Sequence, residues 1–408
     1  MADKADSDVT VPGGAWPEVL LAFLRLGLTS FGGPVAHLGY FRQDIVERRR
    51  WLSERAYADL VALCQFLPGP ASSQIGIGIG LYRAGLPGAL AAWAGFTLPS
   101  ALALALFAMG VESLGGAMGA GWLHGLKLAA VAVVALAVWG MAGTMANDRP
   151  RGTLAVLSAA TVLALPGTTG QLGAIVLGAL AGMAFLRDAP AAAADHVAAP
   201  PLRHGHALGT ACLVLFFLLL FGLPAAAALW PRQDLAVASA FYRAGSLVFG
   251  GGHVVLPLLR ASVVPQGWVS DELFLAGYGA AQAVPGPLFT FSAYLGSVLN
   301  QPPNGWAGAV LCLVAIFLPS FLLVIGCLPF WERLRARPSA QAALRGVNAA
   351  VVGLLLAALY NPVWKSAVLT SGDFALAVGA LLLLAVWKTP PWLVVVLAAL
   401  GGAALAQF

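Results

Sequence analysis

Two arginines occupy equivalent places in apolar stretches of the chain, Arg25 in "FLRLGLTSFGGP" and Arg243 in "FYRAGSLVFGGG". A charged side chain within hydrocarbon costs at least about 2.5–3.5 kcal/mol on insertion scales, so an arginine kept there is a functional candidate. Its planar guanidinium binds an oxyanion through two hydrogen bonds. The pair therefore predicts a site for a tetrahedral dianion. The alternative is that each arginine snorkels to an interface or neutralises a carboxylate such as Asp44.

Each half of the chain also carries Pro-Gly-Pro within an apolar run, "QFLPGPASS" at 65–73 and "QAVPGPLFT" at 282–290. Proline is unfavourable inside a helix but suits its first turn, so a helix should end near each first proline and another begin near the second. A break within the bilayer is tolerated only where it is buried in protein or lines a wet cavity. Free N–H groups at the new helix start would then bind an anion. A plain kink or a short loop between two spans is the alternative.

The candidate substrate-binding residues are the two arginines, the Gly-Pro of each tripeptide and the polar residues that flank it. They are Arg25, Arg243, Gln65, Gln282, Gly69, Pro70, Ser72, Ser73, Gly286, Pro287 and Thr290. The residues assigned as hinges or close-packing points are Gly32, Gly33, Pro68, Gly250, Gly251 and Pro285. His37 and His253 follow the FGG clusters and are candidate proton carriers, because histidine titrates near neutral pH. Plain packing of the FGG clusters and ordinary solvated histidines are the alternatives. No catalytic residue and no metal site is expected.

The two halves of the chain match at an offset near 217 residues, since 282 minus 65 and 285 minus 68 both give 217. Besides the segments above, three further pairs match in order: "WLSERAY" at 51–57 with "WVSDELF" at 268–274, "LPS" at 98–100 with 318–320, and "LHGLK" at 123–127 with "LRGVN" at 344–348. The pattern predicts a first repeat over 1–186, a linker and connecting helix over 187–234, and a second repeat over 235–408.

The composition indicates a membrane protein. Hydrophobic residues make up 60% of the chain and charged residues 10%, which leaves too little polar surface to cover a soluble globule. Apolar stretches long enough to cross about 30 Å of hydrocarbon recur along the chain, so we expect an all-α polytopic protein with about 10–13 transmembrane helices. The four cysteines are isolated in apolar segments and indicate packing. The net charge of +5 comes largely from loops. In a membrane protein such loop charges indicate how the chain is oriented in the membrane, and they do not indicate a nucleic-acid partner.

Six candidate spans in each half and one connector would place the second repeat upside down, as in many secondary transporters. The candidate spans of the first half are 17–33, 57–82, 85–111, 122–146, 152–166 and 169–186. The loop with Arg42, Arg48, Arg49, Arg50 and Arg55 should then be cytoplasmic and its counterpart around 253–273 external. The loop with Arg333, Arg335, Arg337 and Arg345 would fall outside, against the positive-inside rule. A re-entrant hairpin at each PGP would change the number of membrane crossings, so this number stays open.

The segment "FGGPVAHLGYFRQDIVERRRWLSERAYADLVALCQFLPGPASSQIG" and its echoes "FGGGHVVLPLLR" and "QAVPGPLFTFSAYLGS" carry a resemblance that covers essentially the whole chain. The sequence resembles the bacterial chromate transporter family in its long, two-domain form. The resemblance implies a multi-pass protein of the bacterial inner membrane that exports chromate from the cytoplasm, driven by an ion gradient, and confers chromate resistance. The second repeat reads FGGG where the first reads FGGP, so the halves need not contribute equally.

Several functions remain open at this stage. Sulfate nearly matches chromate in shape and charge, so a transporter or passive channel for sulfate or another oxyanion is an alternative. A membrane-bound chromate reductase would need a flavin, nicotinamide or metal site, and no GxGxxG, GxxxxGK or clustered Cys/His pattern is present. We therefore expect a transporter without a cofactor, and no enzyme. The expected partners are chromate or sulfate as substrate and the lipid bilayer, with a homodimer as a further candidate and no nucleic acid.

Overall fold

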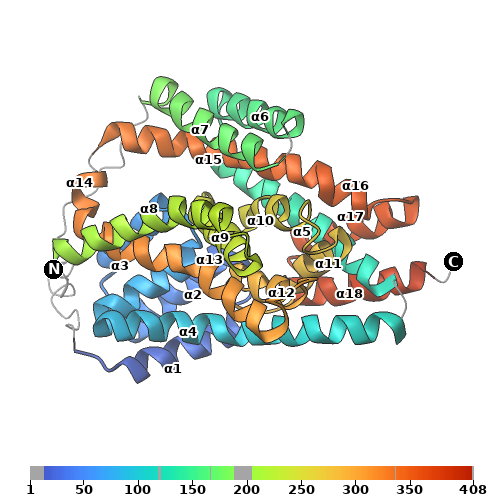
Figure 1. Cartoon of the computed structure of the whole chain (residues 1–408), viewed down its shortest axis with the longest axis horizontal. Coiled ribbons are helices and arrows are strands. Elements are labelled where there is room, and N and C mark those ends of the chain that lie inside the picture. Colours follow the sequence, from blue (N-terminus) through green and yellow to red (C-terminus); the bar gives the residue numbers. More distant parts are fainter. Residues whose placement is uncertain (1–12, 118–120, 166, 188–204, 336, 407–408) are drawn as a thin grey trace.

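The structure is a computed structural model that describes residues 13–117, 121–165, 167–187, 205–335 and 337–406 (Figure 1). These residues form α-helices with short 3-10 and π-helical segments, and they contain no strand. The predicted all-α class is therefore confirmed. The described helical stretches that are long and apolar enough to cross a membrane are Ala71–Gly110, Gly121–Met145, Thr168–Phe185, His206–Leu229, Gly305–Arg335 and Pro338–Ala367.

The elements of the two halves follow one another in the same order. The first half contains α1 (Trp16–Thr29), α2 (Gly33–Phe41), η1 (Arg42–Arg48), α3 (Glu54–Phe66), α4 (Ala71–Ala117), α5 (Gly121–Met145), α6 (Arg149–Ala164) and α7 (Thr168–Phe185). The connecting helix is α8 (His206–Leu229), and most of the linker before it, 188–204, lies outside the described residues. The second half contains α9 (Gln233–Leu247), η2 (Gly252–Val254), α10 (Val255–Val263), α11 (Asp271–Ala281), η3 (Leu288–Thr290), α12 (Phe291–Ser297), α13 (Gly305–Cys327), η4 (Leu328–Phe330), α14 (Trp331–Arg335), α15 (Pro338–Ala358), η5 (Leu359–Trp364), α16 (Lys365–Ala367), α17 (Ser371–Ala385) and α18 (Pro391–Leu405).

Both Pro-Gly-Pro segments break a helix, as predicted. Helix α3 has 13 residues and α11 has 11, so at about 1.5 Å per residue neither can cross about 30 Å of hydrocarbon. The chain reverses at each tripeptide, because Gly78 lies against Leu60 and Gly277 against the ring of Tyr294. Each segment is therefore a re-entrant hairpin with Pro-Gly-Pro at its tip. The single span expected over 57–82 is wrong, because hydropathy alone does not register the reversal.

A second reversal joins each hairpin to a long helix. Within α4 the backbone leaves helical geometry at Ala84 and Gly85, and Gly80 packs directly on the carbonyl of Gly88. The boundary expected between 82 and 85 is thus confirmed, and α4 consists of two antiparallel helices. The same contact recurs between Gly296 and Gly308 in the second half. Glycine is required at these turns because the two backbones touch.

The two repeats are inverted with respect to each other. Trp93 in the long arm of α4 contacts Phe317 and Phe321 of α13, with ring centroids 5.8 Å apart in both pairs. Further along α4, Leu102 lines the same surface groove as Val310. As the residue number rises in α4 it falls in the neighbouring part of α13, so these equivalent helices run antiparallel. An inverted repeat requires this relation.

The repeats also exchange their last two helices. Helices α6 and α7 pack on α15, where Gly182 lies against the carbonyl of Ala342 and Gly353 against that of Ala155. Helices α17 and α18 pack in turn on α5, where Gly125 lies against the carbonyl of Ala398. Figure 1 shows α6 and α7 lying along α15. Small residues at these contacts allow the close approach that membrane helices need, and each repeat completes the fold of the other.

One end of the molecule collects the arginine-rich loops. Asp59, midway along α3, accepts hydrogen bonds from Trp331 at 3.0 Å and from Arg335 at 2.6 Å, which places α14 beside α3. Arg345 donates to the carbonyl of Leu186 at 2.6 Å. The loop around 333–345 therefore lies at the same end as the arginine-rich loop before α3, which the sequence had left open and which agrees with the re-entrant alternative. The re-entrant hairpins remove the conflict with the positive-inside rule.

Candidate functional site

The tips of the two hairpins are held by the opposite repeat. The N–H of Gly69 donates to the carbonyl of Val248 at 2.6 Å, and the N–H of Gly286 donates to the carbonyl of Ser30 at 2.9 Å. Ser30 and Val248 are equivalent residues, because each directly precedes the FGG cluster of its repeat. We call this pair of hydrogen bonds the reciprocal clasp. It brings both Pro-Gly-Pro tips and both FGG clusters to the centre of the protein.

Only glycine fits at the two clasp positions. Gly69 has a φ of +125° and Gly286 a φ of +99°, a left-handed region that other residues rarely adopt. A Cβ on Gly69 would lie 3.1 Å from Oγ of Ser320, and one on Gly286 would lie 2.9 Å from Oγ of Ser100. These serines belong to the two LPS motifs, so each tip also packs on the LPS motif of the other repeat. Three pairs of matched motifs therefore meet in one place.

A cavity of about 410 Å³ lies between the FGG clusters and the second tip. We call it the central cavity. Its walls come from α5, the FGG clusters, the end of α11, the second tip and α17; they are lined by Ser30, Gly32, Gly33, Val133, Leu136, Ala137, Gly140, Met141, Thr144, Met145, Gly250, Gly251, Gly252, His253, Ala281, Gln282, Val284, Gly286, Leu288, Leu384 and Pro391. The two glycines of each FGG cluster have positive φ, so a backbone without side chains forms this part of the wall.

Four residues with hydrogen-bonding side chains line the central cavity among mostly apolar neighbours: Ser30, Thr144, His253 and Gln282. The hydroxyl of Ser30 is fully buried and has no hydrogen-bond partner. His253 shares a hydrogen bond of 2.8 Å between Nδ1 and the hydroxyl of Tyr278, and Gln282 is half-buried. No arginine or lysine of the described residues lines this cavity. Any positive charge in it would therefore come from a proton on His253.

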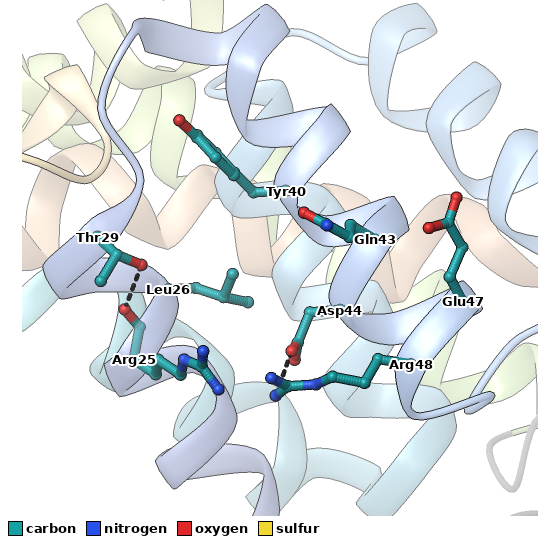
Figure 2. A pocket seen from close by; sticks show the side chains of 8 residues that line it. All are labelled: Arg25, Leu26, Thr29, Tyr40, Gln43, Asp44, Glu47 and Arg48. Carbon is teal, nitrogen blue, oxygen red and sulfur yellow. Dashed lines mark hydrogen bonds and ion pairs between the residues drawn. The ribbon is translucent and has the colours of Figure 1, made fainter.

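A second cavity, of about 470 Å³, lies at the arginine-rich end (Figure 2). We call it the basic-end cavity. It is lined by Arg25, Leu26, Thr29, Tyr40, Gln43, Asp44, Glu47 and Arg48, which come from α1, α2 and η1. Asp44 is paired with Arg48, and its other oxygen accepts from Arg49 at 2.7 Å. Arg243 lines neither cavity. The idea that the two arginines bind one dianion together therefore stays a prediction.

Known proteins resemble this chain along most of its length. The family model described as "Chromate transporter" matches twice, over residues 17–184 and 235–403. The chain belongs to the chromate transporter family. The chromate transport protein of Pseudomonas aeruginosa is 31% identical over 98% of this chain and 94% of its own length. That of Cupriavidus metallidurans is 28% identical over 87% and 84%. No solved structure matches the chain significantly.

The predicted site residues of this family member divide between the cavities and the protein interior. Gly32, Gly33, Gly250, Gly251, Gly286, Gln282 and His253 line the central cavity, and Arg25 lines the basic-end cavity. Ser72 and Ser73 are buried next to the first tip, and Thr290 donates to the carbonyl of Pro287 at 2.8 Å. Gln65 is exposed, and it lines neither cavity. His37 is buried, with Nε2 at 3.2 Å from the carbonyl of Ser30.

Sequence reasoning missed two polar residues at the centre. Gln74 is fully buried, and its Nε2 donates to the carbonyl of Pro68 at 2.7 Å, which braces the first tip. Ser30 contributes both the carbonyl of the clasp and the unpartnered hydroxyl. The available signal was the repeat itself, since the equivalent positions hold Phe291 and Val248. A polar residue in one repeat and an apolar one in the other marks a place where the halves differ in chemistry.

Proposed function

We propose that this chain is a secondary active transporter that exports chromate from the cytoplasm across the bacterial inner membrane, and so confers chromate resistance. The observation that carries the proposal is the reciprocal clasp, which joins two broken hairpins from inverted repeats to the FGG clusters that line the central cavity. Secondary transporters bind substrate at such repeat interfaces, where broken helices present free backbone groups. The relatives named chromate transport proteins supply the substrate class.

In this proposal the oxyanion binds in the central cavity. The N–H groups of the FGG clusters and the hydroxyl of Ser30 donate to its oxygens, because fixed dipoles can replace part of the hydration of an anion. The dipole of the helix that begins after Pro70 adds to the field, with Ser72 and Ser73 in its first turn. The Gly-Pro pairs at 69–70 and 286–287 shape the two tips, and Pro68 and Pro285 end the preceding helices.

Transport then requires the cavity to open to each side in turn. The clasp offers two equivalent contacts, one for each tip, so that release of one and retention of the other would open the cavity on one side at a time. His253 is the titratable side chain among the described residues that line the cavity, and we assign it the role of proton carrier. The arginine-rich end faces the cytoplasm by the positive-inside rule.

The experiment is uptake of labelled chromate into everted inner-membrane vesicles, with and without an energising substrate and with and without excess sulfate. The proposal predicts energised uptake above that of vesicles without the protein. Uptake that equilibrates without energy would point to a passive anion channel. Energised uptake of sulfate but not of chromate would assign the chain to sulfate, and no uptake of either oxyanion would contradict the proposal.

A further inference from the structure

We propose that the basic-end cavity is a docking site that captures the oxyanion before it enters the central cavity. Arg25 and Arg48 would bind the anion, while Asp44 and Glu47 compete with it for the same cations. This inference rests on the proposed function, because it assumes that an oxyanion is the transported substrate. It adds a second site, at a different place in the protein and with different chemistry.

Two cations from different elements converge on this cavity. Arg25 projects from α1 and Arg48 from η1, and Figure 2 shows their guanidinium groups turned toward each other. Arg48 is paired with Asp44, whereas no ion pair involves Arg25 among the described residues. Two guanidinium groups on facing elements can bind opposite sides of a tetrahedral oxyanion, each through two hydrogen bonds.

The charges around the cavity leave a positive excess. Glu47 pairs with Arg42 at 2.6 Å, and Arg42 also pairs with Glu54 at 2.7 Å. With the ion pairs of Asp44, this cluster joins three arginines to three carboxylates, and Arg25 is an additional positive charge beside it. The neutral groups of Tyr40 and Gln43 also line the cavity and can donate hydrogen bonds to further oxygens. Arg25 is therefore the guanidinium left to bind an anion here, whereas the central cavity has no arginine or lysine among its described lining residues.

The two cavities are lined by neighbouring residues of the same segments, and we place them in sequence on the route of the anion. In α1, Thr29 lines the basic-end cavity, and the next residue, Ser30, lines the central cavity. Gly33 likewise lines the central cavity as the first residue of α2, which runs into η1 with Arg48 at its end. An anion held at Arg25 thus lies on the same two elements that form the central site, on the side that faces the cytoplasm under the proposed orientation.

A matched pair of variants tests the role of Arg48. Arg48→Gln and Arg49→Gln each remove one ion pair to Asp44, but only Arg48 lines the cavity. In everted vesicles we expect Arg48→Gln to raise KM for chromate by about five- to tenfold with kcat nearly unchanged, because one charge-assisted hydrogen-bonding group is lost. Arg49→Gln should change KM by less than about twofold, because Arg49 does not line the cavity. Equal effects of the two variants would overturn the docking site.

A second pair keeps the test valid if loss of an arginine disturbs η1. Glu47→Gln and Glu54→Gln each remove a partner of Arg42, and only Glu47 lines the cavity. Glu47→Gln should lower KM for chromate by about twofold, because a competing negative charge is removed, while Glu54→Gln leaves KM unchanged. Equal KM values for the two variants would contradict the inference. Wild-type vesicles that take up no oxyanion would instead contradict the proposed function, so the two failures are distinguishable.

Discussion

Gly286 is a residue whose backbone conformation directly shapes the candidate site. Its φ of +99° and the 2.9 Å that would separate a Cβ from Ser100 leave no room for a side chain. We predict that Gly286→Ala abolishes transport while the protein still reaches the membrane. The left-handed conformation costs an alanine about 1–2 kcal/mol, and this cost weakens the hydrogen bond of the clasp. Gly267→Ala is the matched control: its φ is +68°, and nothing lies within 4 Å of a Cβ there. Equal transport rates in the two variants would argue against the clasp.

His253 gives a prediction about pH. If a proton on its ring supplies the positive charge of the central cavity, transport by the wild type should fall as the pH rises through the titration range of the histidine. His253→Gln keeps a polar side chain without the proton and should transport slowly at every pH. His206→Gln changes an exposed histidine that lines neither cavity, and it should keep the wild-type profile. An unchanged pH profile in His253→Gln would exclude this residue as the proton carrier.

The local chemistry of proline and glycine made part of the site predictable from sequence. Pro-Gly-Pro cannot continue a helix wherever it occurs, so the two breaks and the FGG helix ends are found where they were expected. The partners of a side chain depend instead on which elements meet in space. That is why Arg25 and Arg243 were paired by sequence equivalence although they do not line a common cavity, and why Gln74 was overlooked.

At the scale of elements, the tight hairpins between the re-entrant arms and the long helices decide the shape of the site. Gly80 and Gly88 are in direct backbone contact, so a methyl group on Gly80 must push the two arms of α4 apart. We predict that Gly80→Ala lowers stability by about 1–3 kcal/mol, as overpacking does in tightly packed interiors. Thermal unfolding of the purified protein in detergent would measure it. Gly143→Ala, in α5 with nothing within 4 Å, should be neutral or slightly stabilising.

Element boundaries were predictable where helix-breaking residues occur and less so where only hydropathy guides the assignment. Helices α5, α6 and α7 lie close to the expected spans 122–146, 152–166 and 169–186, and the reversal at 84–85 falls between two earlier expected spans. The segment 57–82 was merged into one span because its residues are apolar on both sides of the tip. A re-entrant arm and a full crossing have similar composition, and they differ in the length of the unbroken helix.

At the scale of the whole molecule, the exchange of α6 and α7 for α17 and α18 makes the repeats depend on each other. We predict that residues 1–186 expressed alone do not accumulate in the membrane, because α6 and α7 lack the α15 surface on which they pack. Coexpression with residues 187–408 should restore both halves. Immunoblots of membrane fractions would measure this, and a stable, abundant first half on its own would contradict the exchanged packing.

The inverted architecture also predicts which loops lie on the same side of the membrane. In a variant without the four native cysteines, Gln266→Cys should react with a membrane-impermeant maleimide added to intact cells. Arg333→Cys, which is exposed at the arginine-rich end, should react only after the membrane is permeabilised. Labelling of both positions in intact cells would contradict the proposed orientation. The sequence alone left the side of the loop with Arg333 open, since it depends on the parity of crossings and hence on the re-entrant hairpins.

The central claim is that the oxyanion occupies the cavity enclosed by the two repeats, and substrate protection tests it most directly. Thr144 is an exposed residue of α5 that lines the central cavity, so in the cysteine-free background Thr144→Cys reports on its occupancy. In vesicles in which this variant still transports, chromate should slow alkylation of that cysteine and leave the alkylation of Arg333→Cys unchanged. Alkylation of Thr144→Cys at the same rate with and without saturating chromate would contradict the account.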